Sequence, residues 1–389
     1  MTYPSVPFTD LLEVIIDNRG RTCPVGSTGR PLIATNCVRN TGLYPSYETD
    51  RFVSDETYAT WFRGHPAPGD ILFVCKGAPG SVAMVPDPVD FCIAQDMVAV
   101  RADSRMIEPN YLFAALRSHD VQTQIGAMHV GTMIPHFKKG DFDKLLIPLP
   151  PRGIQRLIGD TYVDLSRKIE SNRRKAALVQ EVLRAETALL ASESDRTLLV
   201  GDLATSESQR ITDQPHDFPY VGLEHMASFD VVLWNHGRAS DSKSASRLAP
   251  RGAILFGRIR PYFGKVGIAA RDCVVAQSIE VLAPRVPHHA AWLLILLSSR
   301  SFIDRANSLC TGTTMPQVRW EAVAQLAVSV PDEDRLHAFD SLAGPMVEVL
   351  MRLSVENEEL RLLRDALLPE LLSGRLRVRN AESQLDRAL

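Results

Sequence analysis

The chain has 389 residues, 45% of them hydrophobic and 23% charged, with a formal net charge of -3. This length predicts two or three domains rather than one core, and the composition is globular rather than disordered. The charge neither predicts nor excludes a nucleic-acid partner, because such a binder would need its basic residues on one face or help from a basic subunit.

Nothing in the sequence indicates export or membrane insertion. The N-terminus lacks a basic segment followed by an apolar core, and the most apolar window, residues 290–297, is far shorter than the roughly 20 residues of a membrane-spanning helix. Six cysteines are scattered without metal-ligand spacing, which favours a reducing compartment. We therefore expect a soluble, cytoplasmic protein.

The two halves of the chain repeat the same motifs in the same order. Gly69–Phe73 (GDILF) is similar to Gly252–Phe256 (GAILF), about 183 positions later. Three further pairs follow in the same order: Asp90–Gln95 with Asp272–Gln277, Gly131-Thr132 and Pro135 with Gly312-Thr313 and Pro316, and Ile147–Pro150 with Val328–Pro331. Four collinear blocks predict two similar domains in tandem.

Each half shows the sequence pattern of a mixed α/β (α+β) domain. Short β-branched or apolar runs bounded by Gly, Pro or Asp predict strands at 71–74, 97–100, 254–256 and 279–282. Helices are predicted at 111–117 and, in the second half, at 290–298 running on to 306.

A heptad rhythm closes each half and predicts two long helices that pair as an antiparallel coiled coil. The first seam is Ile158, Tyr162, Leu165, Ile169, Asn172, Ala176, Val179, Leu183, Glu186 and Leu190. The second is Phe339, Ala343, Met346, Leu350, Leu353, Asn357, Leu360, Arg364, Leu367 and Leu371. Asn172 and Asn357 fall near mid-helix, where a polar seam residue sets register; alternatively, both lie at the edge of the seam and touch water.

The predicted order along the chain is therefore a globular domain, a long helix, a second globular domain and a second long helix. The expected bounds are 1–150 for the first domain, 151–195 for the central helix, 196–331 for the second domain, 332–378 for the C-terminal helix and 379–389 for a tail.

Enzymatic signatures are missing. Residues 257–265 superficially resemble a phosphate loop, but six residues separate Gly257 from Gly264 where the motif has four, and Val266 follows the lysine where Ser or Thr is required. No metalloprotease helix, nucleophile elbow or dinucleotide fingerprint occurs, and His216, His225 and His236 suit loops or surface better than a metal site. We predict a non-catalytic protein without a catalytic residue or a metal.

The chain resembles the specificity subunit of type I restriction-modification systems over nearly its full length. The resemblance is carried by Gly69-Asp-Ile-Leu, Gly252-Ala-Ile-Leu followed by Arg258, Ile147-Pro-Leu-Pro-Pro151, the closing Leu367-Leu-Pro-Glu-Leu-Leu-Ser-Gly-Arg-Leu376 and, above all, the duplicated layout. It implies two target recognition domains, each reading half of a split DNA sequence. It also implies a phage-defence complex with two adenine methyltransferase subunits, which bind S-adenosylmethionine, and with motor-nuclease subunits that use ATP and magnesium. No cofactor is expected in this chain.

The chain departs from the family pattern in three places. Cys75 with Lys76 stands where an Arg often follows the first GDIL strand, Ala253 replaces the usual Asp, and residues 150–155 lack the Glu-Gln pair common before the helix. These differences put individual contacts in doubt rather than the layout.

Base readout in the major groove uses chiefly Arg or Lys on guanine and Asn or Gln on adenine. In the second half, the candidates Arg258, Arg260, Tyr262 and Lys265 crowd one loop after a strand. The first-half counterpart is Lys76 in Lys76–Gly80, whose glycines could equally make a tight turn.

The Gly-Thr loops form a second candidate surface, suited to phosphate contact, although they could instead cap a following helix or turn. Its residues are Thr132, His136, Lys138 and Lys139 in one half and Thr313, Thr314, Gln317 and Arg319 in the other. We expect Gln95 and Gln277 to be buried in strand-like blocks. For both, a structural hydrogen bond and a contact to adenine are equally plausible roles.

Two other functions stay open at the level of sequence. One is a coiled-coil scaffold whose domains bind proteins only. The other, a stand-alone nuclease, is disfavoured because no carboxylate and metal constellation is visible. The basic run Arg167, Lys168, Arg173, Arg174 and Lys175 on the first helix could face DNA or a partner, although such runs are usually solvated surface.

Overall fold

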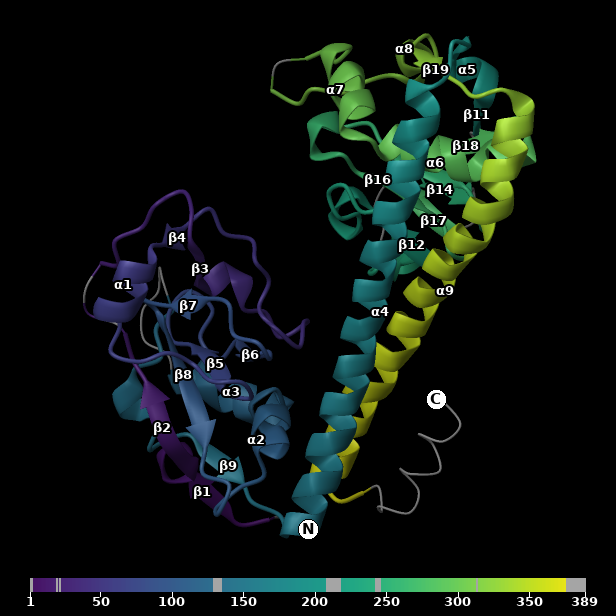
Figure 1. The fold of residues 1–389 in the computed structure, drawn as a ribbon. Helices are drawn as coiled ribbons and strands as arrows, with labels where there is room; N and C mark the ends of the chain where they lie inside the picture. The colour runs from purple at the N-terminus through teal and green to yellow at the C-terminus, as the bar shows by residue number, and fades with distance from the viewer. Residues whose placement is uncertain are drawn as a thin grey trace. The chain divides into compact units, whose positions relative to one another are not determined.

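A computed structural model describes residues 3–18, 20, 22–128, 135–207, 218–241, 246–312 and 314–375. The chain divides into two compact units (Figure 1): unit 1 comprises residues 1–170 and 360–389, and unit 2 comprises residues 171–359. Each unit therefore contains one globular domain and a part of both long helices.

The described residues of unit 1 form three small sheets. A four-stranded antiparallel sheet has the order β2 (Leu12–Ile16), β8 (Met97–Ala102), β5 (Ile71–Val74), β6 (Val82–Met84). The other two sheets are β4 (Phe52–Val53), β3 (Arg30–Ile33), β7 (Cys92–Ile93), and the pair β1 (Ser5–Pro7), β9 (Leu146–Pro148). The short helices are α1 (Asp55–Thr60), α2 (Pro109–Leu116) and α3 (His119–Met128).

Unit 2 repeats this plan. Its antiparallel sheet has the order β11 (Ala204–Glu207), β18 (Ile279–Pro284), β15 (Ile254–Gly257), β16 (Val266–Ile268). The other sheets are β13 (Gly237–Arg238), β12 (Pro219–Val221), β17 (Cys273–Ala276), β14 (Ser246–Ala249), and the pair β10 (Thr197–Leu199), β19 (Ala327–Ser329). The short helices are α5 (Val200–Leu203), α6 (Ala290–Ser298), α7 (Arg300–Ser308) and α8 (Trp320–Val323).

The strand orders of the two units correspond, which confirms the predicted tandem of similar α+β domains. The sheet β2-β8-β5-β6 matches β11-β18-β15-β16, and β4-β3-β7 matches β13-β12-β17, to which unit 2 adds β14. The GDILF and GAILF motifs lead into the equivalent central strands β5 and β15, all of whose residues are buried. No helix within the described residues combines the length and the apolar character needed to cross a bilayer.

The two long helices are α4 (Arg152–Ser192) and α9 (Glu333–Leu372), and they run antiparallel within each unit. In unit 1, Arg364 donates to Ser166 at 3.3 Å; in unit 2, Arg335 pairs with Glu193 at 3.0 Å. Because both helices place apolar side chains in the main core of each unit, the helix pair is part of both domains rather than an appendage.

The seam of α4 departs from the predicted heptad at its C-terminal end. Glu186 is exposed, whereas Gln180, Leu183 and Thr187 are buried. The reason is that this part of the helix also packs on the domain of unit 2. The Gln180 side chain donates to Asp230 Oδ1 at 2.9 Å and accepts from the Val231 amide at 3.0 Å, which turns the buried face by about one residue.

The asparagines of the two seams meet inside unit 2. Asn172 Nδ2 donates to Asn357 Oδ1 at 2.9 Å, and the two residues are only 0% and 5% exposed. The alternative in which both reach water therefore does not hold. Their role in fixing the register stays a prediction.

We expect Asn357→Leu to destabilise unit 2 by about 1–3 kcal/mol, because it leaves the Asn172 amide buried without its acceptor. Asn172→Leu combined with Asn357→Leu removes both polar groups and should recover most of that loss. Urea denaturation of the three variants measures the effect. A double variant no more stable than Asn357→Leu would contradict the pairing.

One predicted helix is broken in two. The run from residue 290 to 306 divides at Ser299, whose backbone is extended (φ -68°, ψ 145°) and whose side-chain oxygen accepts from the Phe302 amide at 3.3 Å. Serine is a favoured N-cap, so it ends α6 and starts α7.

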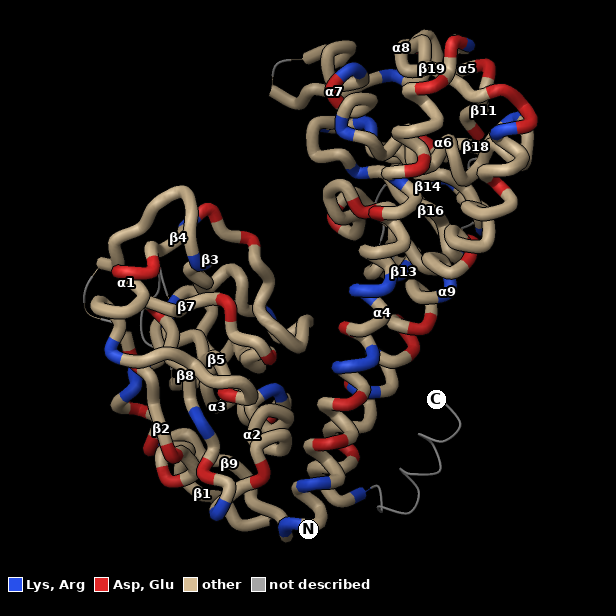
Figure 2. The backbone as a smooth tube through the Cα atoms, in the orientation of Figure 1, with Lys and Arg blue, Asp and Glu red and all other residues tan. Residues whose placement is uncertain are grey.

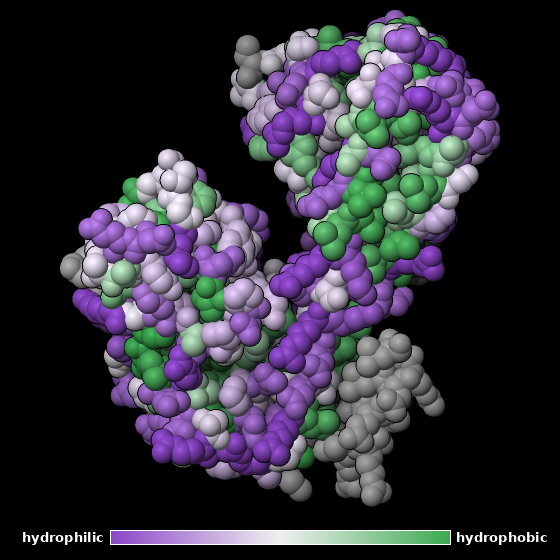
Figure 3. Space-filling model, in the orientation of Figure 1, coloured by the Kyte–Doolittle hydropathy of each residue, from purple (hydrophilic) through white to green (hydrophobic). Residues whose placement is uncertain are grey.

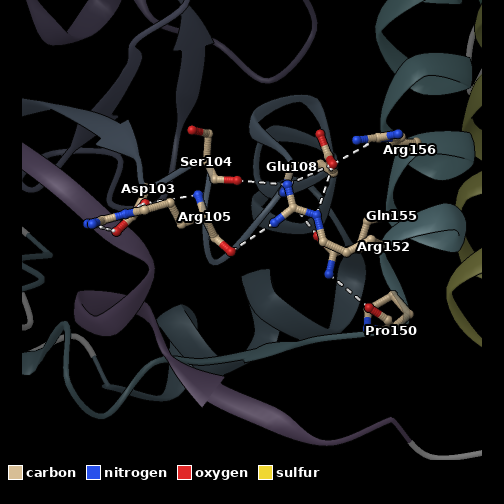
Figure 4. Close-up of polar contacts among 8 residues, drawn as sticks. All are labelled: Asp103, Ser104, Arg105, Glu108, Pro150, Arg152, Gln155 and Arg156. Atoms are coloured by element: carbon tan, nitrogen blue, oxygen red, sulfur yellow. Dashed lines mark hydrogen bonds and ion pairs between the residues drawn. The ribbon is translucent and has the colours of Figure 1, made fainter.

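The start of α4 is held by a cluster of ion pairs and hydrogen bonds (Figure 4). Arg152 bonds to the carbonyl oxygens of Ser104 and Arg105 at 2.7 and 2.9 Å, and both Arg152 and Arg156 pair with Glu108 at 2.8 and 2.9 Å. Burial raises the pKa of Glu108, but the two guanidinium groups outweigh it and the net pKa is lowered. The segment that lacks the family's Glu-Gln pair is thus anchored through arginine.

Candidate nucleic-acid interface

Three segments meet beside the end of strand β15 in unit 2. The Arg258 amide donates to the Ser278 carbonyl at 2.9 Å, in the turn between β17 and β18. From the other side, the Val318 amide donates to the Arg258 carbonyl at 3.0 Å, and the Arg260 amide donates to the Pro316 carbonyl at 2.7 Å. We call this meeting point the unit 2 junction. It joins the two loops that the sequence had suggested as separate surfaces.

Unit 1 has the same junction, bond for bond. The Cys75 amide donates to the Asp96 carbonyl at 2.7 Å, the Phe137 amide to the Cys75 carbonyl at 2.8 Å, and the Gly77 amide to the Pro135 carbonyl at 3.0 Å. Cys75 therefore stands where unit 2 has Arg258, and Gly77 where it has Arg260. The backbone frame is common to both units, while the side chains it presents differ.

The frame places a left-handed backbone at one position in each unit. Gly77 has φ +89°, and its counterpart Arg260 has φ +49° and ψ 61°. Glycine adopts this conformation freely, whereas an arginine pays on the order of 1 kcal/mol for it. Arg260 is exposed, so this backbone strain is retained at a residue whose guanidinium faces solvent.

Arg258 is held by a buried carboxylate. Its Nε lies 3.2 Å from Glu280 Oε2, its Nη2 donates to the Gln277 carbonyl, and its side chain is 23% exposed. Glu280 is 4% exposed and also pairs with Arg247 at 3.0 Å and accepts from Ser206. The sequence reasoning missed Glu280, although a glutamate inside the apolar strand 279–284 was a visible signal. Readout of DNA by Arg258 stays a prediction.

The loop after Arg260 presents aromatic and basic groups. Tyr262 and Phe263 lie in a 3-10 turn (Pro261–Phe263) and are 44% and 41% exposed. Lys265 is half-buried: its Nζ donates to the Leu223 carbonyl at 2.5 Å and lies 5.9 Å from the centre of the Phe263 ring. Tyr262 is thus the more accessible of the two predicted residues.

The third segment of the unit 2 junction alternates between buried and exposed residues. Val318 is 1% exposed and anchors the segment in the core, whereas Gln317 and Arg319 on either side of it are exposed, as is Thr314. Arg319 directly precedes α8, whose capping position it occupies without a side-chain bond. Thr313 lies outside the described residues.

Unit 1 shows the same alternation, with His136, Lys138 and Lys139 around its buried residue. Phe137 is fully buried against Phe73, at 5.8 Å between ring centres, while Lys138 and Lys139 are exposed and His136 is half-buried. Lys139 lies 3.6 Å from Asp17. Lys76 bridges to His136 through the backbone and lies 3.9 Å from Asp96. Thr132 lies outside the described residues.

Gln95 and Gln277 are not buried in strands, contrary to expectation. Both are exposed and lie in the tight turns that follow β7 and β17. Strand β7 ends at Ile93, two residues before Gln95, and strand β17 ends at Ala276, one residue before Gln277, because the chain must reverse there to enter β8 and β18. Both glutamines consequently flank the junction of their unit.

The basic run on α4 is partly engaged within the protein. Arg167 pairs with Asp164 at 3.0 Å, and Arg173 lies 5.8 Å above the Trp234 ring. Along the helix pair, Lys and Arg alternate with Asp and Glu (Figure 2), which is typical of a solvated helix surface.

The chain is similar in sequence to known proteins. A family model described as type I restriction modification DNA specificity domain matches residues 23–181. The EcoDI specificity subunit of Escherichia coli is 21% identical over 283 residues, which cover 60% of this chain and 61% of that protein. The MjaVIII specificity subunit of Methanocaldococcus jannaschii is 20% identical over 332 residues, or 74% of this chain and 75% of that protein.

The fold is also similar to a solved structure. A type I restriction-modification S subunit from M. genitalium superposes with a TM-score of 0.57 at 15% sequence identity, covering 95% of this chain and 96% of that one. At this identity the likeness is one of fold.

Proposed function

Because the chain belongs to the family of type I restriction-modification specificity subunits, which are non-catalytic, we propose that it is the DNA-recognition subunit of such a complex. It reads a bipartite target, with one half-site for each unit. The residues at each junction supply the contacts. In unit 1 these are Lys76, Gln95 and His136, with Lys138 and Lys139 on phosphates; in unit 2 they are Arg260, Tyr262, Gln277 and Gln317, with Thr314 and Arg319 on phosphates.

The observation that carries this proposal is the backbone conformation and exposure of Arg260. An exposed arginine held in a left-handed conformation, where the equivalent position of unit 1 has a glycine, is not explained by stability. Arginine that reaches a guanine edge makes the commonest base-specific contact in the major groove. The shared backbone frame with different side chains is what two readers of different half-sites need.

The proposal extends to partners. Two methyltransferase subunits, with S-adenosylmethionine, would modify adenine, and motor-nuclease subunits, with ATP and magnesium, would cut unmodified DNA in the cytoplasm. An exposed apolar row on α4, formed by Leu178, Val182 and Leu189 (62%, 44% and 53% exposed), lies on the helix part of unit 2, where hydrophobic surface gathers in Figure 3. We assign this row to a methyltransferase contact, since exposed apolar patches mark interaction sites.

The test is an adenine-methylation map of DNA from cells that express the chain with its methyltransferase. Wild type should methylate a split sequence with a fixed gap. Arg260→Gly should keep the stability of unit 2 within about 1 kcal/mol, because glycine accepts the backbone. It should blur one half-site only, by a loss of discrimination of about 1–3 kcal/mol.

The matched control is Arg352→Ala, which removes the same charge from an exposed position on α9 of unit 2 and should leave the map unchanged. A continuous target, or blurring of both halves by Arg260→Gly, would overturn the assignment of one reader to each unit. A map that does not change when the chain is deleted would leave a protein-binding scaffold as the function.

A further inference from the structure

Two histidines and a glutamate converge where the second long helix leaves its domain in unit 2. His288 and His289 end a 3-10 turn (Pro287–His289) just before α6, and Glu333 is the first residue of α9. Both imidazole Nε2 atoms lie 3.0 Å from the same oxygen, Glu333 Oε2. One possible ligand atom from each of the three residues lies within 4.8 Å of the others.

We propose that His288, His289 and Glu333 form a binding site for a divalent transition metal, with zinc the best fit. Zinc prefers imidazole nitrogen and carboxylate oxygen at about 2.0–2.2 Å in a tetrahedral arrangement. Three such ligands around one point, with a fourth position open to water, make that set. The ion would replace the two hydrogen bonds that now share one carboxylate oxygen.

The ligands are held in place by their surroundings. The His289 side chain is 5% exposed and the His288 side chain 19%, while Glu333, at 48%, leaves one side open to solvent. The His288 ring stacks on the His337 ring, one turn further along α9, at 3.6 Å between centres. This stacking restricts the rotation of His288 and keeps its Nε2 directed at Glu333.

The charges around the site are compatible with a cation. Arg196 pairs with the other carboxylate oxygen, Glu333 Oε1, at 3.0 Å, so Oε2 is left for the metal. Asp340, two turns after Glu333 on α9, interacts electrostatically with His288 and His289. The carboxylate would thus be oriented by Arg196 while it binds the ion.

Unit 1 provides an internal comparison. The start of α4 occupies the place of the start of α9, and there Arg152 reaches back to Glu108 in front of α2 (Figure 4). In unit 2 the helix begins with a carboxylate, and the segment before α6 supplies imidazoles. The contact between the start of the long helix and the segment before the short helix is therefore made by a guanidinium and a carboxylate in unit 1. In unit 2 it is made by two imidazoles and a carboxylate, which are groups that can bind a metal.

The test is zinc binding to the untagged full-length chain, measured by calorimetry, with cobalt(II) absorption as the probe of tetrahedral geometry. We expect one zinc per chain and a rise in the melting temperature of unit 2 with zinc over EDTA. His288→Gln and Glu333→Gln should each weaken zinc binding by about tenfold or more and abolish the zinc-dependent rise.

His119→Gln is the matched control, since this exposed histidine at the start of α3 in unit 1 lies outside the cluster; the variant should retain stoichiometric zinc. Comparing each variant with and without zinc separates metal binding from any loss of folding stability. The proposal is overturned if zinc does not bind at one per chain, or if the ligand variants bind it as tightly as wild type. It is also overturned if the ligand variants lower the melting temperature in EDTA but do not change zinc binding. That result would show that the three residues form an ion pair and no metal site.

Discussion

Replacing Gly159 by alanine is expected to destabilise unit 1 by about 3 kcal/mol or more, a fall in melting temperature of roughly 6–12 °C. Gly159 lies in α4 where the helix crosses α2. A Cβ there would stand 2.4 Å from the Tyr111 nitrogen and 2.7 Å from the Asn110 carbonyl carbon. Because both atoms belong to the backbone, no side chain can move aside, and the two helices must separate. Thermal unfolding of the full chain measures the effect.

The matched control is Gly153→Ala in the same helix. No heavy atom lies within 4 Å of a Cβ added there, and alanine favours helix over glycine by about 0.5–1 kcal/mol. This variant should melt at the wild-type temperature or slightly above it. Equal behaviour of the two variants would mean that α4 and α2 do not pack this closely in the protein.

The second large effect is expected at Glu280. Glu280→Gln leaves Arg247 and Arg258, whose side chains are only 16% and 23% exposed, without their counter-charge. Breaking a buried pair on one side costs about 3–5 kcal/mol. Arg258 would also be released from its place in the unit 2 junction, so the methylation map should lose one half-site and keep the other.

Urea denaturation and the methylation map together test this expectation. Glu348→Gln is the control, because it breaks the exposed ion pair with Arg251 in the same unit, which should cost about 1 kcal/mol or less. If Glu280→Gln were no worse than this control, the buried cluster would not contribute to the stability of unit 2.

The sequence predicted the elements whose signals are local. The strand at 71–74 is β5 itself, the helix at 111–117 overlaps α2, and both heptad runs lie within α4 and α9. Such predictions succeed because periodicity and turn residues act between near neighbours in the chain. The internal repeat was equally visible, since it depends only on comparing the chain with itself.

The candidate site was predicted residue by residue but not as an arrangement. Arg258 was one of the predicted readers, yet its guanidinium is paired with Glu280, 22 positions away. Arg260 beside it is exposed, and its left-handed backbone cannot be read from residue type. Gln95 and Gln277 were expected in strands, because alternation alone does not show where a strand gives way to a turn.

By itself, the sequence determined that this protein has two similar α+β domains, each ending in a long helix with an asparagine in its seam. Only the tertiary structure decided which loops form one surface. It also decided that the buried face of α4 includes Gln180 and Thr187. It likewise brings His288 and His289 to Glu333. The physical reason is separation along the chain. Helices and strands arise from contacts a few residues apart, whereas each of these features joins segments that only packing of the sheets and helices brings together.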